Sequence, residues 1–306
     1  MSSIESILNQ TFKDFEFIII DDASTDSSYK IAQSYQARDN RIVFLKNEQN
    51  MGLTKSLNKA LRLAKGTFVA RQDADDFSIV TRLEKQYEFL KSHPEIVLVA
   101  TSASIIDSNN NEIFPKHYQL SPDQISKFLK RHNIIVHGSV MFRKKEILDL
   151  GCYREHFKYA QDYELWLRLI EKHKISIIPK YLYKIKISIE NLSMRSGLLQ
   201  DEFAKLAKKF YSQRKKYGKD NYENFFRTFD LDKIKTDNNR AKAKYHFLKG
   251  MYLLGEDKIS LLRKELISSI KYYPFSLVAY FYFLISLFGL KGINLLRKIR
   301  DLIYKL

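Results

Sequence analysis

Short apolar runs alternate with helical patterns over the first half of the chain. The run from Phe15 to Ile20 is apolar except at Glu16 and stops at two aspartates, which is typical of a buried parallel strand. Helices are indicated where apolar residues recur every three or four positions. The predicted strands are 15–20, 42–45, 67–70, 96–100, 102–107 and 112–113, and the predicted helices are 27–36, 53–64 and 82–91. This alternation predicts an α/β fold with a mostly parallel sheet that is flanked by helices.

The pattern changes after about Gly197, where the strand signals stop and amphipathic helices follow. We therefore divide the chain into an α/β domain over residues 1–195 and an all-α region over residues 196–306. The helices predicted for the second region are 198–217, 241–254 and 259–271.

An apolar and aromatic stretch from Phe275 to Leu290 follows these helices. It is shorter than the roughly 20 residues that a membrane span needs. The basic residues Lys291, Arg297, Lys298, Arg300 and Lys305 come after it. An apolar face with basic flanks is typical of an interfacial helix, so we expect an amphipathic helix near 275–306 on an anionic membrane surface. The alternative is a buried terminal helix of the all-α region.

Composition limits the class of protein. With 45% hydrophobic and 28% charged residues among 306, the chain is expected to form a sizeable core. These values exclude a disordered tail and a polytopic membrane protein. Cys152 is the single cysteine, which fits a reducing compartment, and Met1 to Gln10 show no secretory signal. We therefore expect a cytoplasmic protein.

The formal net charge of +17 favours anionic partners: phosphates, nucleic acid or anionic lipid. The sequence contains none of the familiar nucleic-acid-binding motifs, so nucleic-acid binding is supported by composition alone. We expect phosphate groups and an anionic membrane surface as partners, and no nucleic acid.

Aspartates follow two of the predicted strands. The first strand ends in Asp21 and Asp22, and residues 73–76 hold three aspartates after the third strand. Ligands of parallel sheets bind beyond the carboxyl ends of the strands, so both groups are expected at one edge. Asp73 and Asp75 form a D-x-D pattern, whose oxygens suit Mg²⁺ or Mn²⁺ that bridges to phosphate. The alternatives are local: a helix cap for Asp75 and a turn carboxylate for Asp22.

A further carboxylate lies at the start of another predicted helix. Asp162 precedes an apolar helix face that includes Tyr163 and Trp166. It is a candidate general base that takes the proton of an acceptor hydroxyl, and an N-cap is the alternative. His137, in a predicted strand at 134–143, is a candidate for an acceptor-side or metal-side role, with a structural histidine as the alternative. Trp166 is a second acceptor-side candidate.

Several stretches of the chain match one family in order. They are S-I-L-N-Q-T-F at 6–12, the run ending D-D-A-S-T-D at 15–26, N-M-G-L at 50–53, A-R-Q-D-A-D-D at 70–76, H-G-S-V-M-F-R at 137–143 and Q-D-Y-E-L-W-L-R at 161–168. Together they resemble the family 2 glycosyltransferases over about residues 1–195, and the ordered set is far more specific than any single motif. The resemblance implies a GT-A fold and an inverting, metal-dependent glycosyltransferase of hexosyl or N-acetylhexosaminyl type.

The resemblance also implies roles for single residues. Asp22 is similar to the family's aspartate that binds the nucleotide base. Asp73 and Asp75 are similar to its donor and metal aspartates, with Asp75 as the direct ligand of Mg²⁺ or Mn²⁺. Asp162 is similar to its catalytic base.

The substrates follow from the same resemblance. The implied donor is a nucleoside-diphosphate sugar, with a UDP-sugar favoured, and the implied acceptor is a saccharide or a lipid-linked saccharide. Family members of this type often build bacterial surface polysaccharide, such as lipopolysaccharide, capsule or exopolysaccharide. This implies a peripheral position on the inner face of the cytoplasmic membrane.

Three departures from the family pattern leave an alternative open. The family begins with a strand and loop of the V-S-V-I-I-P-x-Y-N type, whereas this sequence starts inside the next helix, so we expect a misplaced start or a truncation. Gln161 stands where many relatives carry Glu, and Ser188 stands where relatives often carry a metal-binding His. The alternative function is a catalytically decayed relative that binds a membrane or a partner protein.

Overall fold

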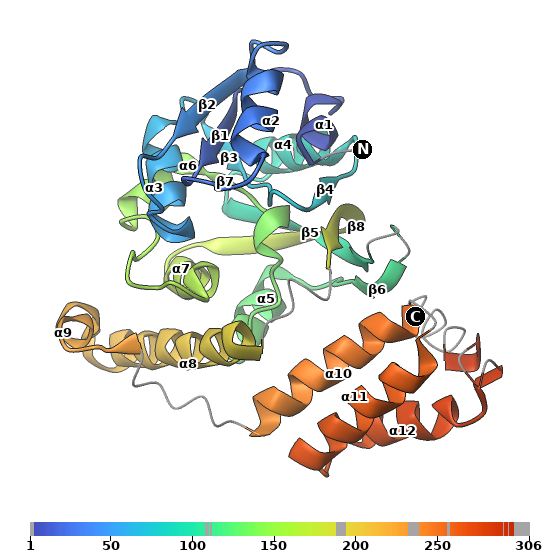
Figure 1. Cartoon of the computed structure of the whole chain (residues 1–306). Helices are drawn as coiled ribbons and strands as arrows, with labels where there is room; N and C mark the ends of the chain where they lie inside the picture. Colours follow the sequence, from blue (N-terminus) through green and yellow to red (C-terminus); the bar gives the residue numbers. More distant parts are fainter. Residues whose placement is uncertain are drawn as a thin grey trace.

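The computed structural model describes residues 3–107, 110, 112–187, 194–231, 239–255, 258–289, 291–292 and 294–296. Figure 1 shows an α/β part followed by a group of helices. In chain order the elements are α1 (Ser3–Leu8), β1 (Phe17–Asp21), α2 (Ser28–Gln36), β2 (Ile42–Lys46), α3 (Leu53–Leu63), β3 (Phe68–Ala70), β4 (Phe77–Ser78), α4 (Arg82–Ser92), β5 (Ile96–Ile106), β6 (Glu112–Lys116), α5 (Pro122–Leu129), the 3₁₀ turn η1 (His137–Ser139), β7 (Met141–Arg143), α6 (Lys144–Asp149), α7 (Gln161–Leu169), β8 (Lys174–Lys186), α8 (Met194–Tyr217), α9 (Tyr222–Arg227), α10 (Asn239–Gly255), α11 (Ile259–Tyr272) and α12 (Leu277–Ser286).

The described strands form two sheets. β1 and β2 pair in parallel, with Phe17 opposite Ile42 and Asp21 opposite Lys46, and α2 connects them. The second sheet has the order β3-β7-β5-β8-β4, and β6 adds to β5. All eleven residues of β5 are buried, as expected for a strand covered on both faces. The two strands predicted at 96–100 and 102–107 are therefore one continuous strand.

The α/β class and the helical end of the chain are confirmed, but the strand directions differ from the expected mostly parallel sheet. Among the described strands only the pairs β1–β2 and β5–β8 are parallel, and the other four pairs are antiparallel. A helical crossover returns the chain in the same direction, as α2 does between β1 and β2. A connection of only a few residues joins β5 to β6 instead, which allows an antiparallel pair. The other antiparallel pairs, β3–β7, β5–β7 and β4–β8, join strands that are far apart along the chain.

No element was predicted for residues 174–186, although β8 lies there and pairs with β5 over its whole length. The register of this pair shifts between Ile178 and Tyr181. Pro179 lies in that shift, and a proline cannot donate a hydrogen bond to a neighbouring strand. The bulge accommodates the proline inside a strand that otherwise has alternating apolar positions.

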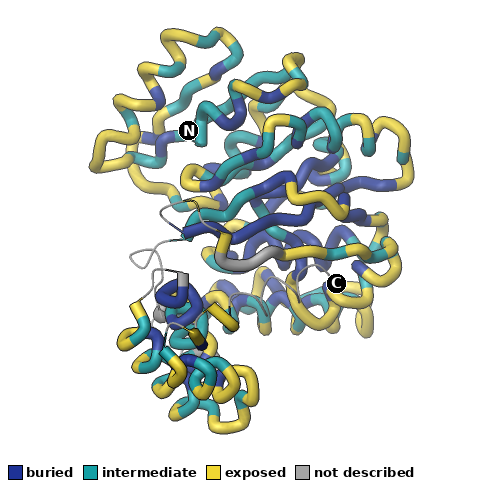
Figure 2. The backbone as a smooth tube through the Cα atoms, turned by 90° about the vertical axis from the view of Figure 1, so that its right-hand side faces the viewer, coloured by how far each residue is buried: buried dark blue, intermediate teal, exposed yellow. Residues whose placement is uncertain are grey.

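Helices cover both faces of the larger sheet. α4 packs on one face with the cluster that contains Leu83, Leu90 and Val99. On the other face, Val97 and Leu98 of β5 join a larger cluster with α5 and α7. Figure 2 shows buried backbone through the middle of the larger part of the molecule. All nine residues of α7 are also buried.

The all-α region contributes to two separate cores. Phe203 and Phe210 of α8 and Phe226 of α9 belong to the large cluster of the α/β part. The predicted boundary at residue 195 therefore falls within one packed unit. α10, α11 and α12 form a second cluster around Met251 and Leu266, which Ile105 of β5 joins. Within the part of the chain that the structure describes, no helix has both the length and the apolar character that crossing a bilayer requires.

Candidate active site

Arg71 lies at the centre of the candidate site, directly after β3. Its side chain is 8% exposed, and its guanidinium forms a two-pronged ion pair with the carboxylate of Asp73. Burial alone would lower the pKa of Arg71, but the charge of Asp73 raises it above the ordinary value. The arginine is therefore firmly charged, and it fixes Asp73 in one orientation.

Two buried side chains hold the segments of the site together. Arg82 of α4 donates to the carbonyl oxygens of Arg71 at 2.9 Å and of Gly138 at 2.6 Å. The hydroxyl of Tyr183 in β8 accepts a hydrogen bond from the backbone N–H of Asp73 at 3.1 Å. The loop after β3, the turn η1 and β8 thus meet at one place, although they are far apart in sequence.

Gly138 permits this close approach. A Cβ atom at this position would lie 1.9 Å from the Tyr183 hydroxyl oxygen and 2.8 Å from Oδ2 of Asp73. Both distances are far inside van der Waals contact, and both neighbours are themselves hydrogen-bonded. The wall around Asp73 therefore depends on the absence of a side chain here.

Replacing Gly138 by alanine is expected to lower the free energy of unfolding by about 1–3 kcal/mol, because the added methyl group overpacks a buried site. Urea denaturation measures this change. Gly197→Ala is the matched control, since a Cβ at Gly197 in α8 meets nothing within 4 Å. Equal stability of the two variants would contradict the close packing of Gly138.

The acidic loop after β3 concentrates negative charge. Burial raises the pKa of Asp76 to about 7, and the negative charge of Asp73 is the second cause of this shift. Oδ1 of Asp76 accepts the backbone N–H of Lys186 at 2.9 Å, so this carboxyl ties the loop to β8. Burial and the charge of Asp73 also raise the pKa of Asp75, even though its own backbone N–H and the charge of Arg71 act in the opposite direction. The loop therefore favours a cation or a proton near Asp75.

The predicted metal ligands, Asp73 and Asp75, do not form a complete metal site by themselves. In the described ranges, no three His, Cys, Asp or Glu side chains are grouped so that they could hold an ion alone. Asp73 is paired with Arg71, whereas Asp75 feels the negative charge of Asp73. Magnesium commonly uses one or two carboxylates and takes its other oxygens from phosphates and water, so this arrangement fits an ion that arrives with a phosphate ligand. Ser188 lies outside the described residues.

Asp162 is the second residue of α7 and is 9% exposed. The helix begins at Gln161, and the residue before it, Ala160, is the N-cap. Ala160 adopts a left-handed φ of 50°, which is uncommon for a residue with a Cβ, so Asp162 is not the N-cap. Burial raises the pKa of Asp162, although hydrogen bonds from Tyr163 N–H and Asn133 and the charge of Arg71 oppose this. A buried carboxylate with a raised pKa suits a general base.

The charge of Arg71 also acts on His137. Burial, and next Arg71, hold the pKa of His137 well below its usual range, so the ring is neutral. Its Nε2 lies 2.8 Å from the hydroxyl oxygen of Tyr153, and its ring packs edge-on against Trp166. Trp166 is fully buried in the core. It therefore supports the wall behind His137 and does not reach an acceptor directly.

The sequence predicted a strand at 134–143, but this is wrong at His137, which is the first residue of the turn η1 ahead of β7. The hydroxyl of Ser139 donates to the carbonyl oxygen of Val136 at 2.9 Å, a local bond that closes the turn. The close packing at Gly138 also requires this turn. The pattern of apolar residues predicts neither the Ser139 hydrogen bond nor the packing of Gly138.

Asp22 holds the start of α3. Its carboxylate accepts hydrogen bonds from Nδ2 of Asn47 at 2.7 Å, from Met51 N–H at 2.9 Å and from Gly52 N–H at 2.8 Å. Although burial alone would raise the pKa of Asp22, these bonds lower it. This role differs from a turn carboxylate that stabilises the helix start at Ser24, because the partners lie on the loop before α3. Met51 N–H bonds to Oδ1 and Gly52 N–H to Oδ2.

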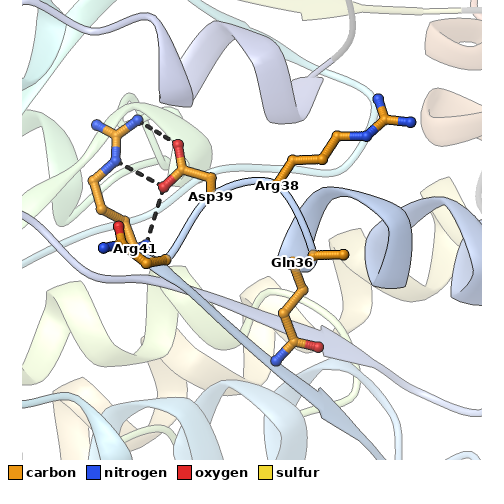
Figure 3. Close-up of a pocket in the computed structure, with 6 residues that line it drawn as sticks. Gln36, Arg38, Asp39 and Arg41 are labelled. Atoms are coloured by element: carbon orange, nitrogen blue, oxygen red, sulfur yellow. Dashed lines mark hydrogen bonds and ion pairs between the residues drawn. The ribbon is translucent and has the colours of Figure 1, made fainter.

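Two cavities of the described residues lie away from the candidate carboxylates, because neither is lined by Asp22, Asp73, Asp75 or Asp162. One of about 550 Å³ lies over the turn between α2 and β2, where Asp39 holds Arg41 and Arg38 points away from that pair (Figure 3). This turn precedes β2, so it is at the opposite end of the strands from Asp22. A second cavity of about 470 Å³ runs along α3, lined by Met51, Lys55, Lys59, Arg62, Leu63 and Glu155.

The site also contains residues for which the sequence analysis gave no role: Arg71, Tyr183 and Asn133. Arg71 carried a usable signal, since a charged residue at the end of an apolar strand needs a partner. The sequence around Tyr183 and Asn133 held no such signal, because their partners Asp73 and Asp162 lie 110 and 29 positions away along the chain.

Comparison with known proteins identifies relatives of this chain. The model of a family described as Glycosyl transferase family 2 matches residues 2–151. An uncharacterized glycosyltransferase of Methanocaldococcus jannaschii is 40% identical over 190 residues, which are 60% of this chain and 64% of that protein. The amylovoran biosynthesis glycosyltransferase AmsE of Erwinia amylovora is 32% identical over 195 residues, which are 63% of this chain and 73% of that protein.

A solved structure has the same fold. The crystal structure of S. aureus TarS in complex with UDP-GlcNAc matches with a TM-score of 0.53 at 18% identity, over 88% of this chain and 84% of that chain. The GT-A fold implied by the motifs is thereby confirmed.

Proposed function

The chain belongs to the family 2 glycosyltransferases, and on this premise we propose that it catalyses an inverting sugar transfer from a nucleoside-diphosphate sugar to an acceptor hydroxyl. The observation that carries this proposal is the position of η1, where Gly138 packs against Asp73 and the neighbouring His137 packs against Trp166 of α7, the helix whose second residue is Asp162. η1 thus connects the donor-side carboxylate to the helix of the candidate base, and a reaction between two bound substrates requires both groups at one site.

In the proposed reaction, Asp162 takes the proton of the acceptor hydroxyl. The hydroxyl oxygen forms a bond to the anomeric carbon of the donor while the bond from that carbon to the diphosphate oxygen breaks on the opposite face. The nucleoside diphosphate leaves with the bonding electron pair, and the configuration at the anomeric carbon inverts. The buried position of Asp162 raises its pKa, which increases its affinity for the proton it accepts.

We also assign donor-side roles to the remaining aspartates. Asp75 would hold a Mg²⁺ or Mn²⁺ ion, with Asp73 beside it as a donor-binding residue oriented by Arg71. Such an ion, when bound, neutralises charge on the leaving diphosphate. Asp22 would act at the nucleotide base by ordering the loop before α3, since its carboxylate accepts the N–H groups of Met51 and Gly52.

Replacing Asp75 by alanine is expected to weaken UDP binding in the presence of Mn²⁺ by about 10- to 100-fold, since one charge-assisted contact is lost. Isothermal titration calorimetry measures this change. Removing the metal from the unchanged protein with EDTA is expected to weaken UDP binding to a similar extent. Asp149→Ala, an exposed carboxylate of α6, is the control.

Two other results are informative. Equal UDP affinity with and without Mn²⁺ would remove the metal from the proposal. A complete lack of UDP binding by the unchanged protein would favour a catalytically decayed relative.

The substrates are proposed from the relatives. TarS is seen with UDP-GlcNAc, which supports a UDP-sugar donor of hexosyl or N-acetylhexosaminyl type. AmsE is named for amylovoran biosynthesis, which supports a role in polysaccharide synthesis. We propose surface polysaccharide as the product and a saccharide or lipid-linked saccharide as the acceptor.

A lipid-linked acceptor would bring the protein to a membrane, and α12 supports this. Phe275, Leu277 and Phe288 around this helix are 81%, 82% and 75% exposed. Transfer of each such large apolar side chain out of water is favourable by about 1.5–3 kcal/mol of free energy. The exposed side chains of Lys264, Lys271 and Lys291 would meet anionic headgroups. We therefore propose a peripheral position on the inner face of the cytoplasmic membrane; residues 297–306 lie outside the described ranges.

The double substitution Phe275→Glu with Phe288→Glu is expected to weaken binding to anionic vesicles at least about tenfold, because two exposed apolar anchors are lost and charges of the wrong sign are added. Sedimentation with phosphatidylglycerol vesicles measures this. Tyr217→Glu, which changes an aromatic side chain that is 63% exposed on α8, is the matched control. Unchanged vesicle binding of the double variant would show that this surface does not contact lipid.

A further inference from the structure

A hydrogen bond from Asn133 reaches the carboxylate of Asp162. Asn133 lies in the loop between α5 and η1, and its Nδ2 donates to Oδ2 of Asp162 at 2.8 Å. Oδ1 of the same amide accepts the backbone N–H of Ile135 at 3.1 Å. Asn133 is exposed, whereas Asp162 is nearly buried, so the bond lies where the site opens to solvent.

The two bonds define the orientation of the amide. A backbone N–H can only donate, so the carbonyl oxygen of the Asn133 side chain must face Ile135. The amide nitrogen then faces Asp162, and a carboxylate can only accept from it. The opposite orientation would place two donors together and two acceptors together. Asn133 is therefore held in the one orientation that donates to Asp162.

We propose that Asn133 is a positioning residue for the reaction, which holds the carboxylate of Asp162 so that Oδ1 faces the acceptor hydroxyl. This inference rests on the proposed role of Asp162 as the base. The bond to Oδ2, together with the hydrogen bond from Tyr163 N–H, limits rotation of the carboxylate, and we assign Oδ1 as the atom that takes the proton. An alignment error of about 1 Å in such a group lowers the rate by about 10²-fold, so orientation matters as much as charge.

The chemical type of the donor supports this role. An amide orders the carboxylate through a neutral hydrogen bond, whereas a lysine or arginine in direct contact would lower its proton affinity strongly. The charged and titratable groups whose electrostatic interaction with Asp162 is resolved are Arg71 after β3, Lys116 of β6 and Tyr153 ahead of α7. None of them has a hydrogen bond to this carboxylate within the described residues.

The experiment compares Asn133→Asp and Asn133→Ala with the unchanged protein. The first variant keeps the shape of the side chain and its bond to Ile135 N–H but replaces the donor by a second carboxylate. The second variant truncates an exposed side chain, so it is expected to fold. For each, kcat, the donor KM and the pH dependence of kcat are measured with UDP-sugar and acceptor. Lys130→Ala, an exposed substitution at the end of α5, is the control.

We expect kcat to fall about 10- to 100-fold in both variants while the donor KM is unchanged. The bond from Asn133 favours the ionised carboxylate, so its loss moves the acidic limb of the profile to higher pH. In N133D the added like charge is expected to increase this displacement to about one pH unit or more. Lys130→Ala should reproduce the unchanged profile.

An acidic limb at the same pH in all three proteins would overturn the inference and leave Asn133 with a structural role. Asp162→Asn is measured alongside. If that variant loses turnover while the Asn133 variants keep the original profile, only the positioning role fails. If Asp162→Asn retains full transfer, the base assignment itself fails, and the positioning role fails with it.

Discussion

Replacing Asp162 by asparagine is expected to reduce kcat by about 10²- to 10⁴-fold while UDP binding in the presence of Mn²⁺ is unchanged. An amide has the size of the carboxylate and can still accept the hydrogen bond from Asn133 through its carbonyl oxygen. It cannot take a proton at neutral pH. The ion pair between Arg71 and Asp73 does not involve Asp162, so donor binding has no reason to change.

The measurement combines single-turnover transfer assays with calorimetry on the same preparation. Asp149→Asn is the control, since this carboxylate is exposed on α6 and pairs only with Lys145 among the described residues. Full transfer by Asp162→Asn would show that another group accepts the proton. Loss of UDP binding together with turnover would place Asp162 on the donor side.

The largest effect on stability is expected from Glu164→Gln. The Glu164 side chain is fully buried, and both of its carboxylate oxygens accept from Nε of Arg168, at 3.0 and 2.9 Å. Oε1 of Glu164 also lies 3.2 Å from Nη1 of Arg154 and 3.9 Å from Nη1 of Arg214 in α8. Removing one partner of a buried charge network leaves desolvated cations without compensation, so we expect the free energy of unfolding to fall by about 3–5 kcal/mol.

Trp166 provides the measurement. It is the single tryptophan, it is fully buried, and it lies two positions from Glu164 on α7, so its fluorescence reports urea unfolding of this region. Lys145→Met, which removes an exposed ion pair with Asp149, is the control and should leave the unfolding midpoint unchanged. An equally small change for Glu164→Gln would mean that water or Asp220 compensates the buried arginines.

This network also explains why α8 and α9 pack on the α/β part. Asp220, which lies just before α9, pairs with Arg154 at 2.8 Å and with Arg214 of α8. Both helices are therefore connected to the segment that precedes Asp162. A partial loss of this contact would loosen the start of α7. Glu164→Gln is therefore expected to lower transfer activity at temperatures where the global fold persists.

Much of the local structure was predictable from the sequence. The apolar run ending in Asp21 is β1, and the helices α2, α3 and α4 begin and end within two residues of the predictions. These elements depend on residues that are close neighbours along the chain, since apolar period, turn residues and helix propensity all act over a few positions. The ordered motifs likewise identified the family, because each is a local pattern.

Strand pairing was decided only by the tertiary structure. β5 runs without a break because both of its faces are covered by helices and both edges by strands, which no local pattern shows. β8 was not predicted because Pro179 interrupts its pattern, and the bulge opposite β5 resolves the conflict. Which strands run antiparallel depends on loop lengths and partners that lie many residues apart.

The candidate site shows the same division. Sequence alone located the acidic loop after β3 and the carboxylate at the start of α7, because the residue types that suit a metal or a proton transfer are few. It could not show that Arg71 pairs with Asp73, that Gly138 makes room for Tyr183, or that Asn133 reaches Asp162. Those contacts join segments that are separated along the chain, and their geometry exists only once the sheet has brought the segments together.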